Sequence, residues 1–310
     1  MELVRATEAA AIRAYPFIGK GDKNAADGAA VDAMRAFLGT VNFEGLVVIG
    51  EGEKDDAPML FNGEVVGTGQ GPKVDIAVDP IDGTSLTAAG RQNAISVIAV
   101  ADRGSMLDAS AVYKMNKFVV GPMGKDVCDI RKPISENIRA YAKASGKAVD
   151  EVVVAVLDRA YNAELIEEIR AAGAATRLLR DGDVASGIQA AREQSRIDMS
   201  VGIGGSPEGI VTACGIKALG GLIQGILSPT EEFEYERGEA AGLKFNHVYE
   251  MDEMVSSDNT FFVATGVTDG ALMSGVRKRG DLIFTESIVI RGRSGTVRTV
   301  LAEYQADRWI

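Results

Sequence analysis

Residues 74–85 read VDIAVDPIDGTS, so an apolar strand leads directly into two carboxylates and a Gly-Thr-Ser turn. If the strand ends at Asp79 and Pro80 bends the backbone, the side chains of Asp79 and Asp82 converge on one point. Such oxygen ligands suit hard divalent cations, and Mg²⁺ is typically held by a few carboxylates together with a substrate phosphate. Backbone N–H groups of residues 83–85 would face that phosphate. Taken alone, the run is equally typical of an ordinary Asp-Pro turn, so the rest of the chain must decide.

A second acidic segment, GEGEKDD at residues 50–56, follows a predicted strand at 46–49. Two like charges ~4 Å apart repel by about 4 kcal/mol at an effective dielectric constant of roughly 20. A converging cluster of this kind therefore needs a cation or a bound proton. A solvated acidic loop is the alternative, although the glycines on either side of Glu51 favour a close approach of the backbone to another group.

A third segment, GIGGSPEG at residues 202–209, stands between a predicted strand at 197–201 and a predicted helix at 207–219. It does not match the dinucleotide-binding fingerprint, because Pro207 occupies the place of the last glycine. Ser206 as N-cap with Pro207 at the first helical position predicts a helix start that directs Glu208 toward a ligand. A plain cap with a solvent-facing glutamate is the alternative.

The length of the chain predicts two lobes, and the alternation of strands and helices from about residue 152 onward predicts α/β structure. Helices are predicted at 2–14, 27–38, 163–171, 183–193 and 207–219. Strands are predicted at 46–49, 74–78, 94–101, 118–120, 152–157, 176–179, 197–201, 222–227, 260–264, 282–290 and 297–302. The glycine-rich run 67–72 is expected to be a hairpin connection, and the acidic run 230–239 a solvated helix or loop.

Composition limits the classes of partner. The chain has 310 residues, 46% hydrophobic and 25% charged, which predicts a chain folded throughout. Its formal net charge of −11 argues against nucleic-acid or anionic-membrane partners, since these require a basic surface. An acidic protein that binds an acidic substrate needs local screening, most simply by bound cations.

Cysteine and histidine usage narrows the chemistry further. Cys128 and Cys214 are too few for a disulfide framework or a zinc cluster, which indicates a reduced, cytoplasmic setting. No signal-peptide core is present, and no stretch reaches the ~18 to 20 apolar residues of a membrane span. His247 is the single histidine, which nearly excludes histidine-based triads and metal sites. The chemistry is therefore expected to use carboxylates, hydroxyls and metal.

Taken together, the motifs resemble one branch of the lithium-sensitive sugar-phosphate phosphatase superfamily, the class II fructose-1,6-bisphosphatases of the GlpX type. The resemblance spans nearly the whole chain and rests on GDKNAADGAAV at 21–31, VIGEGE at 48–53, DPIDGT at 79–84, 202–209, and ATGVTDG at 264–270. It implies a layered α-β-α-β-α sandwich, with an α+β lobe at 1–140 and an α/β lobe at 141–310. It also implies hydrolysis of the 1-phosphate of fructose 1,6-bisphosphate to fructose 6-phosphate in gluconeogenesis, with sedoheptulose 1,7-bisphosphate as a second substrate.

The resemblance assigns roles by position. Two or more sites for Mg²⁺ or Mn²⁺ are implied, one held by Asp27 and Glu51 and another by Asp79, Asp82 and Glu208. The attacking water would be oriented or deprotonated by Asp55 and Thr84, with Lys23 beside the phosphate. A metal lowers the pKa of such a water and stabilises charge on the phosphoryl oxygens. The implied substrate-binding residues are Gly83, Thr84, Tyr113, Arg159, Tyr161, Asp181, Asp183 and Gly205.

One segment departs from the family pattern. Residues 159–162 read RAYN, where the family usually has Arg or Lys, Pro, Arg, His. The second basic residue is expected to bind the distal phosphate, a charge-assisted contact worth ~1.5 to 3 kcal/mol that Tyr161 cannot supply. Either neighbours such as Arg159, Arg177 or Arg180 suffice, or the substrate is a different sugar or cyclitol phosphate.

A non-catalytic sugar-phosphate sensor is the third interpretation of the chain. A homo-oligomer, dimer or tetramer, is the expected assembly.

Overall fold

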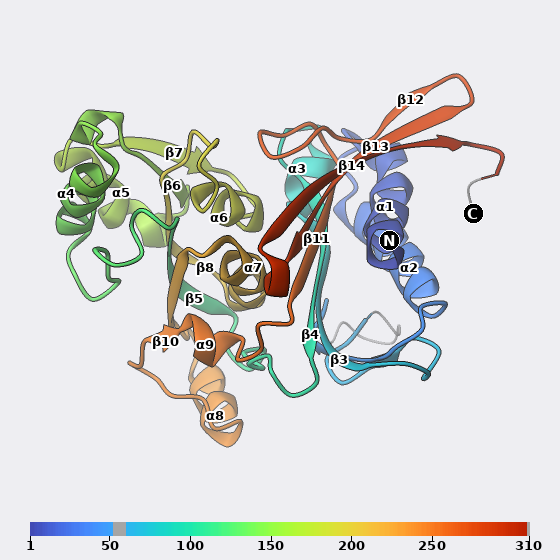
Figure 1. Cartoon of the computed structure of the whole chain (residues 1–310), viewed down its shortest axis with the longest axis horizontal. Coiled ribbons are helices and arrows are strands. Elements are labelled where there is room, and N and C mark those ends of the chain that lie inside the picture. The colour runs from blue at the N-terminus through green and yellow to red at the C-terminus, as the bar shows by residue number, and fades with distance from the viewer. Residues whose placement is uncertain (52–59, 309–310) are drawn as a thin grey trace. The chain divides into compact units, whose positions relative to one another are not determined.

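A computed structural model describes residues 1–51 and 60–308 and divides the chain into two compact units (Figure 1). The terminal unit comprises Met1–Ser105 and Asn259–Ile310, and the central unit comprises Met106–Asp258. This division differs from the expected lobes at 1–140 and 141–310. The reason is that the last strands of the chain return to the first sheet, which local periodicity does not reveal.

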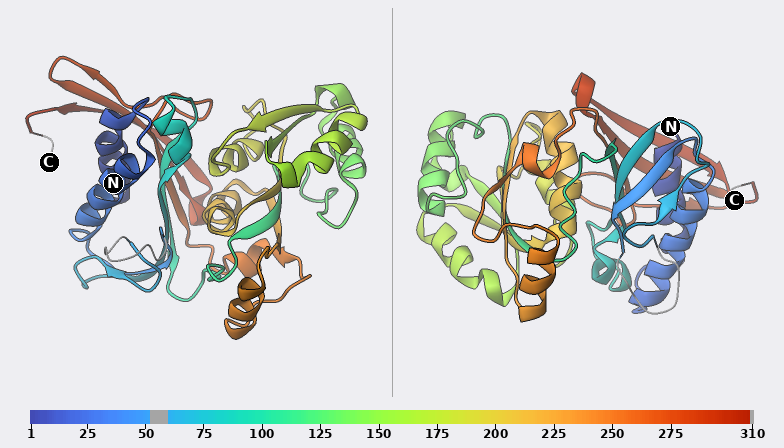
Figure 2. Two further views of the ribbon diagram at one scale, coloured as in Figure 1. Left: turned by 180° about the vertical axis from the view of Figure 1, so that it is seen from behind. Right: turned by 90° about the horizontal axis from the view of Figure 1, so that it is seen from below.

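The terminal unit contains a sheet in the order β12-β13-β11-β4-β3-β1-β2, with β14 paired to β13. Its strands are β1 (Glu44–Ile49), β2 (Val65–Val66), β3 (Lys73–Asp82), β4 (Ile95–Asp102), β11 (Phe261–Gly266), β12 (Arg277–Arg279), β13 (Leu282–Arg291) and β14 (Thr296–Gln305). Helices α1 (Glu2–Ala14) and α2 (Lys23–Leu38) pack side by side against this sheet, as Figures 1 and 2 show. The short α3 (Thr84–Ala88) follows β3.

Buried polar contacts attach the C-terminal strands to α1. Glu8 is 2% exposed, and its carboxylate accepts hydrogen bonds from Thr285 Oγ1 on β13 at 2.8 Å and from Tyr304 Oη on β14 at 2.5 Å. Buried polar groups are stable when they are paired in this way. The chain end is thereby fixed to the unit in which the chain begins.

The central unit contains a second mixed sheet in the order β10-β9-β5-β8-β6-β7. Its strands are β5 (Lys114–Val120), β6 (Val153–Leu157), β7 (Ala175–Leu179), β8 (Met199–Gly205), β9 (Leu222–Leu227) and β10 (Tyr249–Glu250). Helices α4 (Ile134–Ser145) and α5 (Ala163–Ala171) cover one face and share its apolar core, while α6 (Val184–Ala190) and α7 (Ser206–Leu219) pack together on the other (Figure 1). Helices α8 (Glu232–Ala240) and α9 (Met251–Met254) follow β9.

The predicted α/β class is confirmed, and so are the helices at 2–14 and 163–171. Helix α2 begins at Lys23, earlier than predicted, because Asp22 caps it by accepting the backbone N–H of Ala25 at 3.0 Å. The prediction of a hairpin connection at 67–72 is wrong. Strands β2 and β3 both pair with β1, which lies between them.

Candidate active site

A bulge in β3 brings two predicted metal ligands to one face of the sheet. The strand was expected to end at Asp79, but it continues through Pro80 to Asp82. Asp79 pairs with Val97 and Asp82 with Ile95, so β3 carries one more residue than β4 in this interval. Side chains alternate along a strand, and residues three apart would normally point to opposite faces. The extra residue reverses that relation and places both carboxylates on the same face.

The turn after the bulge is held by its own side chains. Asp79 Oδ1 accepts the N–H of Ile81 at 3.0 Å, and Thr84 Oγ1 donates to the Ile81 carbonyl at 3.1 Å. Gly83 has φ of +96°, a left-handed conformation that favours glycine and lets the chain enter α3 at Thr84. Asp82 is 3% exposed, so its carboxylate lies inside the protein.

Helix α2 begins beside this turn. The loop before it is hydrogen-bonded to α3, since Gly19 N–H donates to Thr87 O and Gly21 N–H to Ala88 O, both at 2.9 Å. Lys23 and Asp27 stand four residues apart in α2 and therefore share one face of the helix. The structure thus brings the start of α2, with these two side chains, to the same end of the unit as Thr84.

Strand β1 delivers Glu51 to the same end. It runs parallel to β3, with Ile49 opposite Ala77, so Glu51 follows at the level of Asp79. A Cβ at Gly50 would overlap the Leu60 carbonyl oxygen, which confirms that the backbone is closely packed here. The predicted catalytic residue Asp55 lies outside the described residues.

In the central unit, the predicted sugar-binding residues gather at one edge of the sheet. Strands β6, β7 and β8 run parallel, and the antiparallel β5 begins where they end. Ligands commonly bind at the carboxyl ends of such strands. The loops at this edge hold Tyr113 before β5, Arg159 after β6, Asp181 and Asp183 after β7, and Gly205 and Glu208 at the junction of β8 and α7.

Tyr113 is anchored through its backbone while its ring stays 52% exposed. Its N–H donates to Glu234 Oε1 at 2.8 Å, and its carbonyl accepts from Ser206 N–H at 3.0 Å. The ring lies 6.0 Å from that of Phe233 in an edge-on arrangement. Nearby, Arg159 Nη2 approaches Asp181 Oδ1 at 3.4 Å. An aromatic face and a guanidinium are therefore presented at this edge.

Glu234 is a residue that the sequence analysis missed. The run 230–239 does contain a helix, α8, but Glu234 is fully buried instead of solvated. Burial alone would raise the pKa of Glu234, but hydrogen bonds from the N–H groups of Tyr113, Thr230 and Glu231 outweigh it and lower the pKa. The spacing of Glu231 and Glu234 at a helix start was the available signal.

Glu208 lies at the start of α7 against Gly205. The predicted Ser206 N-cap is wrong, because Gly205 holds the cap position and makes no side-chain cap bond. A Cβ at Gly205 would overlap the Glu208 carboxylate, so only glycine leaves room for it. Within the described residues, the buried Glu208 Oε2 has no hydrogen-bond partner. Burial raises the pKa of Glu208, the Lys117 charge opposes this, and Asp183 adds to it.

Lys117 is the second residue that the sequence analysis missed. It lies within β5, is 6% exposed, and pairs through Nζ with Asp183 Oδ2 at 2.6 Å. Its ammonium also donates to the Gly205 carbonyl at 2.9 Å. A lysine inside an apolar strand was the available signal, since buried lysines are rare unless they are paired.

Residues 159–162, which depart from the family pattern, have two different roles. Asn162 is 1% exposed and braces β8, because its Nδ2 donates to Ile203 O at 3.0 Å while its Oδ1 accepts Ile203 N–H at 2.9 Å. Tyr161 is 43% exposed, and the Lys114 ammonium lies 4.7 Å from its ring centre. A positive charge is therefore held next to Tyr161 by a cation–π contact.

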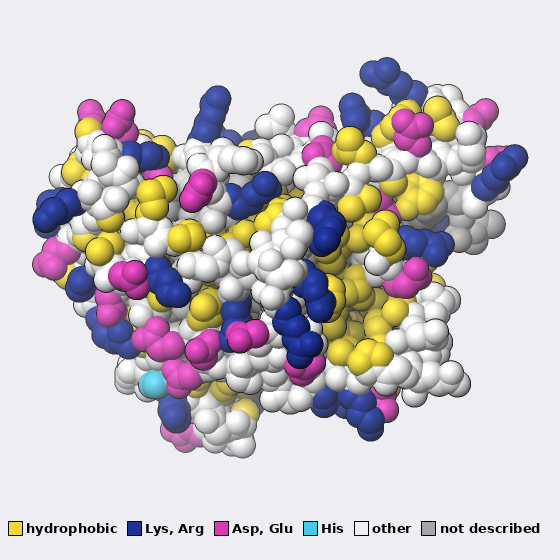
Figure 3. All heavy atoms as spheres, in the orientation of Figure 1, with side chains coloured by type: hydrophobic (Ala, Val, Ile, Leu, Met, Phe, Trp, Pro, Cys, Tyr) yellow, Lys and Arg dark blue, Asp and Glu magenta, His cyan; other side chains and the backbone are white. Residues whose placement is uncertain are grey.

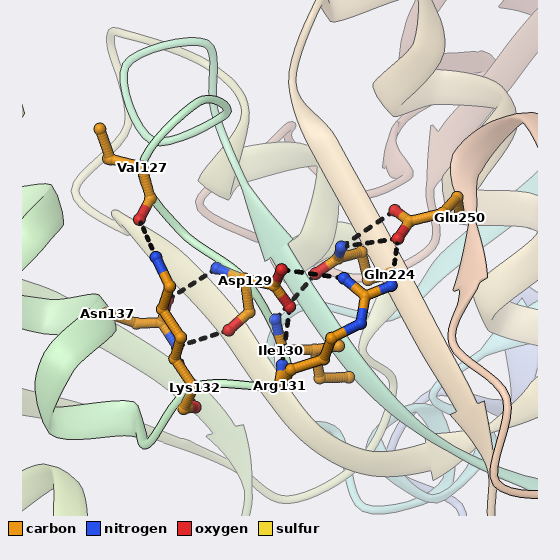
Figure 4. Close-up of polar contacts among 8 residues, drawn as sticks. All are labelled: Val127, Asp129, Ile130, Arg131, Lys132, Asn137, Gln224 and Glu250. Carbon is orange, nitrogen blue, oxygen red and sulfur yellow. Dashed lines mark hydrogen bonds and ion pairs between the residues drawn. The ribbon is translucent and has the colours of Figure 1, made fainter.

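Tyr161 also borders a cavity of about 310 Å³ lined by β5, β8, α5 and the loop before α4. The loop is fixed by the polar contacts in Figure 4. Buried Asn137 donates to the carbonyls of Asp129 and Lys132 at 2.9 and 3.2 Å, and Gln224 Oε1 accepts Ile130 N–H at 2.8 Å. This wall is thus held by hydrogen bonds within the protein.

Other features agree with chemistry that does not use histidine. His247 lies at the surface, where Figure 3 shows it in cyan, and its Nε2 contacts Glu253 Oε1 at 2.7 Å. Over residues 1–51 and 60–308, no three Asp, Glu, His or Cys side chains form a ready-made metal cage.

In the same part of the chain, none of the helices has the length and apolar character needed to cross a membrane.

An α/β fold with carboxylates at strand ends fits a phosphoric monoester hydrolase, and the family of the chain defines that class. A family model described as bacterial fructose-1,6-bisphosphatase, glpX-encoded, matches residues 1–304, and the chain belongs to this family. It is 43% identical over 321 aligned residues to fructose-1,6-bisphosphatase 1 class 2 of Escherichia coli K12, covering 99% of this chain and 95% of the relative. Class 2 enzymes of Escherichia coli O6:H1 and Shigella flexneri match with the same identity and coverage.

Proposed function

We propose that this chain hydrolyses the 1-phosphate of fructose 1,6-bisphosphate, giving fructose 6-phosphate and inorganic phosphate, as a cytoplasmic enzyme of gluconeogenesis. The observation that carries the proposal is the β3 bulge, which presents Asp79 and Asp82 on one face in a chain of this family. Sedoheptulose 1,7-bisphosphate is a second expected substrate, and a homo-oligomer, dimer or tetramer, is the expected form.

The residues present fit divalent metal. The donor set is all oxygen, as Mg²⁺ and Mn²⁺ prefer, and the buried Glu208 Oε2 lacks a partner among the described residues. In the terminal unit, one ion would be held by Asp27 and Glu51 and a second by Asp79 and Asp82, and Glu208 in the central unit is the further predicted metal ligand. When bound, such ions offset charge on the phosphoryl oxygens and favour deprotonation of water.

The chain's own residues supply the remaining steps. The Thr84 hydroxyl donates its proton to Ile81 O, so its oxygen is left to accept a hydrogen bond from the attacking water. Asp55 would take the water proton, and Lys23 would neutralise a phosphoryl oxygen. The water oxygen bonds to phosphorus while the bond from phosphorus to the C1 oxygen breaks, and that oxygen leaves with the electron pair and takes up a proton.

The central unit would bind the sugar. Tyr113 offers a ring face, and the carboxylates of Asp181 and Asp183 accept hydrogen bonds from sugar hydroxyls. Arg159 and Lys114, which lies beside Tyr161, would supply positive charge to bind a distal phosphate. The backbone of Gly205 would make a further contact with the sugar, while Gly83 in the terminal unit would offer its backbone to the phosphate.

Phosphate release by metal-stripped protein, with Mg²⁺ or Mn²⁺ added back, tests the proposal. The substrates are fructose 1,6-bisphosphate, sedoheptulose 1,7-bisphosphate, fructose 1-phosphate and inositol 1-phosphate. Fast, metal-dependent release from the bisphosphates is expected. Release from monophosphates alone would mean that residues 159–162 select a different sugar or cyclitol phosphate.

The Thr84→Ala variant separates an enzyme from a non-catalytic sensor. In an enzyme this change removes turnover while calorimetric binding of fructose 6-phosphate persists. A wild-type protein that binds the sugar phosphate tightly, yet releases no phosphate with either metal, would contradict the proposal.

A further inference from the structure

Lys117 connects two segments that carry predicted ligand-binding groups. Its Nζ lies 2.6 Å from Asp183 Oδ2, in the loop after β7, and 2.9 Å from the carbonyl of Gly205, next to Glu208. Both the lysine and aspartate side chains are largely buried, at 7% and 12% exposure. The ammonium of Lys117 therefore contacts both the Asp183 carboxylate and the Gly205 backbone, against which Glu208 packs.

The charge balance shows why an ammonium is needed there. Asp183 and Glu208 would otherwise place two carboxylates near one another with little solvent, and like charges destabilise such a site. Removing one member of a buried pair leaves an uncompensated charge, which is strongly unfavourable. Lys117 neutralises the aspartate and leaves Glu208 Oε2 without a hydrogen-bond partner within the described residues.

The glycines of residues 202–209 fit around this lysine. A Cβ at Gly204 would overlap Asp183 Oδ2 and lie 3.0 Å from Lys117 Nζ, and a Cβ at Gly209 would lie 3.2 Å from Lys117 Cδ. Real Cβ atoms rarely approach so closely, so glycine at positions 204 and 209 leaves room for the lysine side chain and its ion pair. The glycines of this segment, which does not match a dinucleotide-binding fingerprint, therefore make room for Lys117 and Glu208.

We propose that Lys117 is a positioning residue that fixes the Asp183 carboxylate for a sugar hydroxyl and fixes the Gly205–Glu208 turn, so that sugar and metal ligands keep one geometry. This inference rests on the proposed function, in which Asp183 binds sugar and Glu208 binds metal. Lys117 is not proposed to contact the phosphate or the attacking water. It acts through Asp183 and the Gly205–Glu208 turn.

Lys217 provides a matched control in the same unit. Its side chain is 8% exposed, its Nζ lies 2.6 Å from Asp252 Oδ1, and it donates to Val255 O at 2.9 Å. It therefore makes the same two kinds of contact at the other end of α7. The variants to compare are Lys117→Met and Lys217→Met, each characterised by thermal unfolding, steady-state kinetics and calorimetric binding of fructose 6-phosphate without metal.

Lys117→Met is expected to weaken fructose 6-phosphate binding and raise KM by at least about tenfold, because a displaced Asp183 loses its hydrogen bonds to sugar. Lys217→Met is expected to lower thermal stability while keeping affinity and KM within about twofold. Lys117→Gln, which keeps an N–H donor for Gly205, replaces the methionine variant if that variant does not fold. It should still lose sugar affinity, because it cannot neutralise Asp183.

A double-mutant cycle with Asp183→Asn completes the test. If Lys117 acts through Asp183, the double variant binds fructose 6-phosphate about as weakly as Asp183→Asn alone. Unchanged affinity and KM in folded Lys117 variants would overturn the inference and leave the proposed function standing. A wild-type protein that neither binds fructose 6-phosphate nor hydrolyses the bisphosphate would overturn both.

Discussion

The two units place their acidic side chains at strand ends by different means. In the terminal unit, Asp79 and Asp82 are aligned by a bulge within one strand, and the following turn is held by contacts between residues two and three apart. In the central unit, Asp183 and the Gly205 carbonyl near Glu208 are held by Lys117, which comes from a strand far away in sequence. An arrangement of side chains built from neighbouring residues can be recognised in a short motif, whereas one assembled from distant segments cannot.

The largest effect is expected from Asp82→Asn, which keeps the shape of the bulge but removes a charge from the proposed metal site. We predict a loss of kcat on the order of 10³-fold and a need for far more Mn²⁺. Asp75→Asn is the control on the same strand, where Asp75 accepts Ser105 N–H at 2.8 Å. It should reduce thermal stability with the metal requirement unchanged. Equal kinetic losses in both variants would contradict a specific role of the Asp82 carboxylate.

Gly205→Ala tests whether the central unit depends on close packing. The new Cβ would displace the Glu208 carboxylate, and kcat/KM should fall by about 10- to 100-fold with the fold intact. Gly39→Ala is the matched control, since Gly39 has an ordinary φ of −58° and its nearest contact would be 3.4 Å. Wild-type kinetics in Gly205→Ala would show that Glu208 need not lie against this residue.

Glu234→Gln tests the anchor of Tyr113. Loss of charge-assisted hydrogen bonds should cost about 2 kcal/mol of unfolding free energy at neutral pH and raise KM about fivefold. Because the pKa of Glu234 is lowered by folding, its contribution is present above its unfolded pKa of about 4.3 and is lost as pH falls through the folded value.

The stability gap between wild type and Glu234→Gln should therefore close in acid, as measured by urea unfolding at pH 7 and at progressively lower pH. Glu232→Gln, on the exposed first turn of the same helix, is the control and should show little change at either pH. A gap that stays constant down to the lowest pH would contradict the role of the ionised carboxylate.

The smallest effect is expected from Lys114→Met, which removes the charge held over Tyr161. KM for fructose 1,6-bisphosphate should rise about threefold, while KM for fructose 1-phosphate, which lacks the distal phosphate, stays unchanged. Lys125→Met serves as a surface control, because Lys125 is exposed. Equal changes on both substrates would exclude a contact with the distal phosphate.

The sequence predicts much of the local structure. The alanine-rich helix at residues 2–14 and the helix at 163–171 follow from their periodicity, and the carboxylates of residues 79–84 are found from one motif. The strand was expected to end at Asp79, but it continues to Asp82, and the bulge places both carboxylates on one face. Local spacing suffices where the partners are neighbours in the chain.

Long-range pairing explains the remaining differences. The return of β13 and β14 to the first sheet depends on pairing with β11 and on the contacts of Glu8, which local periodicity does not encode. Burial of Lys117 and Glu234 follows from partners 66 and 121 residues away, at Asp183 and Tyr113. The bracing role of Asn162 likewise depends on Ile203, on a different strand.

We assign metal binding to the β3 bulge and sugar binding to the central unit. The most direct test is a pair of calorimetric titrations on wild type, Asp82→Asn and Asp183→Asn. One titration uses Mn²⁺ in the absence of sugar, and the other uses fructose 6-phosphate in the absence of metal. We predict that Asp82→Asn loses most Mn²⁺ affinity and keeps its affinity for fructose 6-phosphate, while Asp183→Asn does the reverse. If each variant weakened both ligands equally, or neither, the assignment of metal to the β3 bulge and of sugar to the central unit would be contradicted.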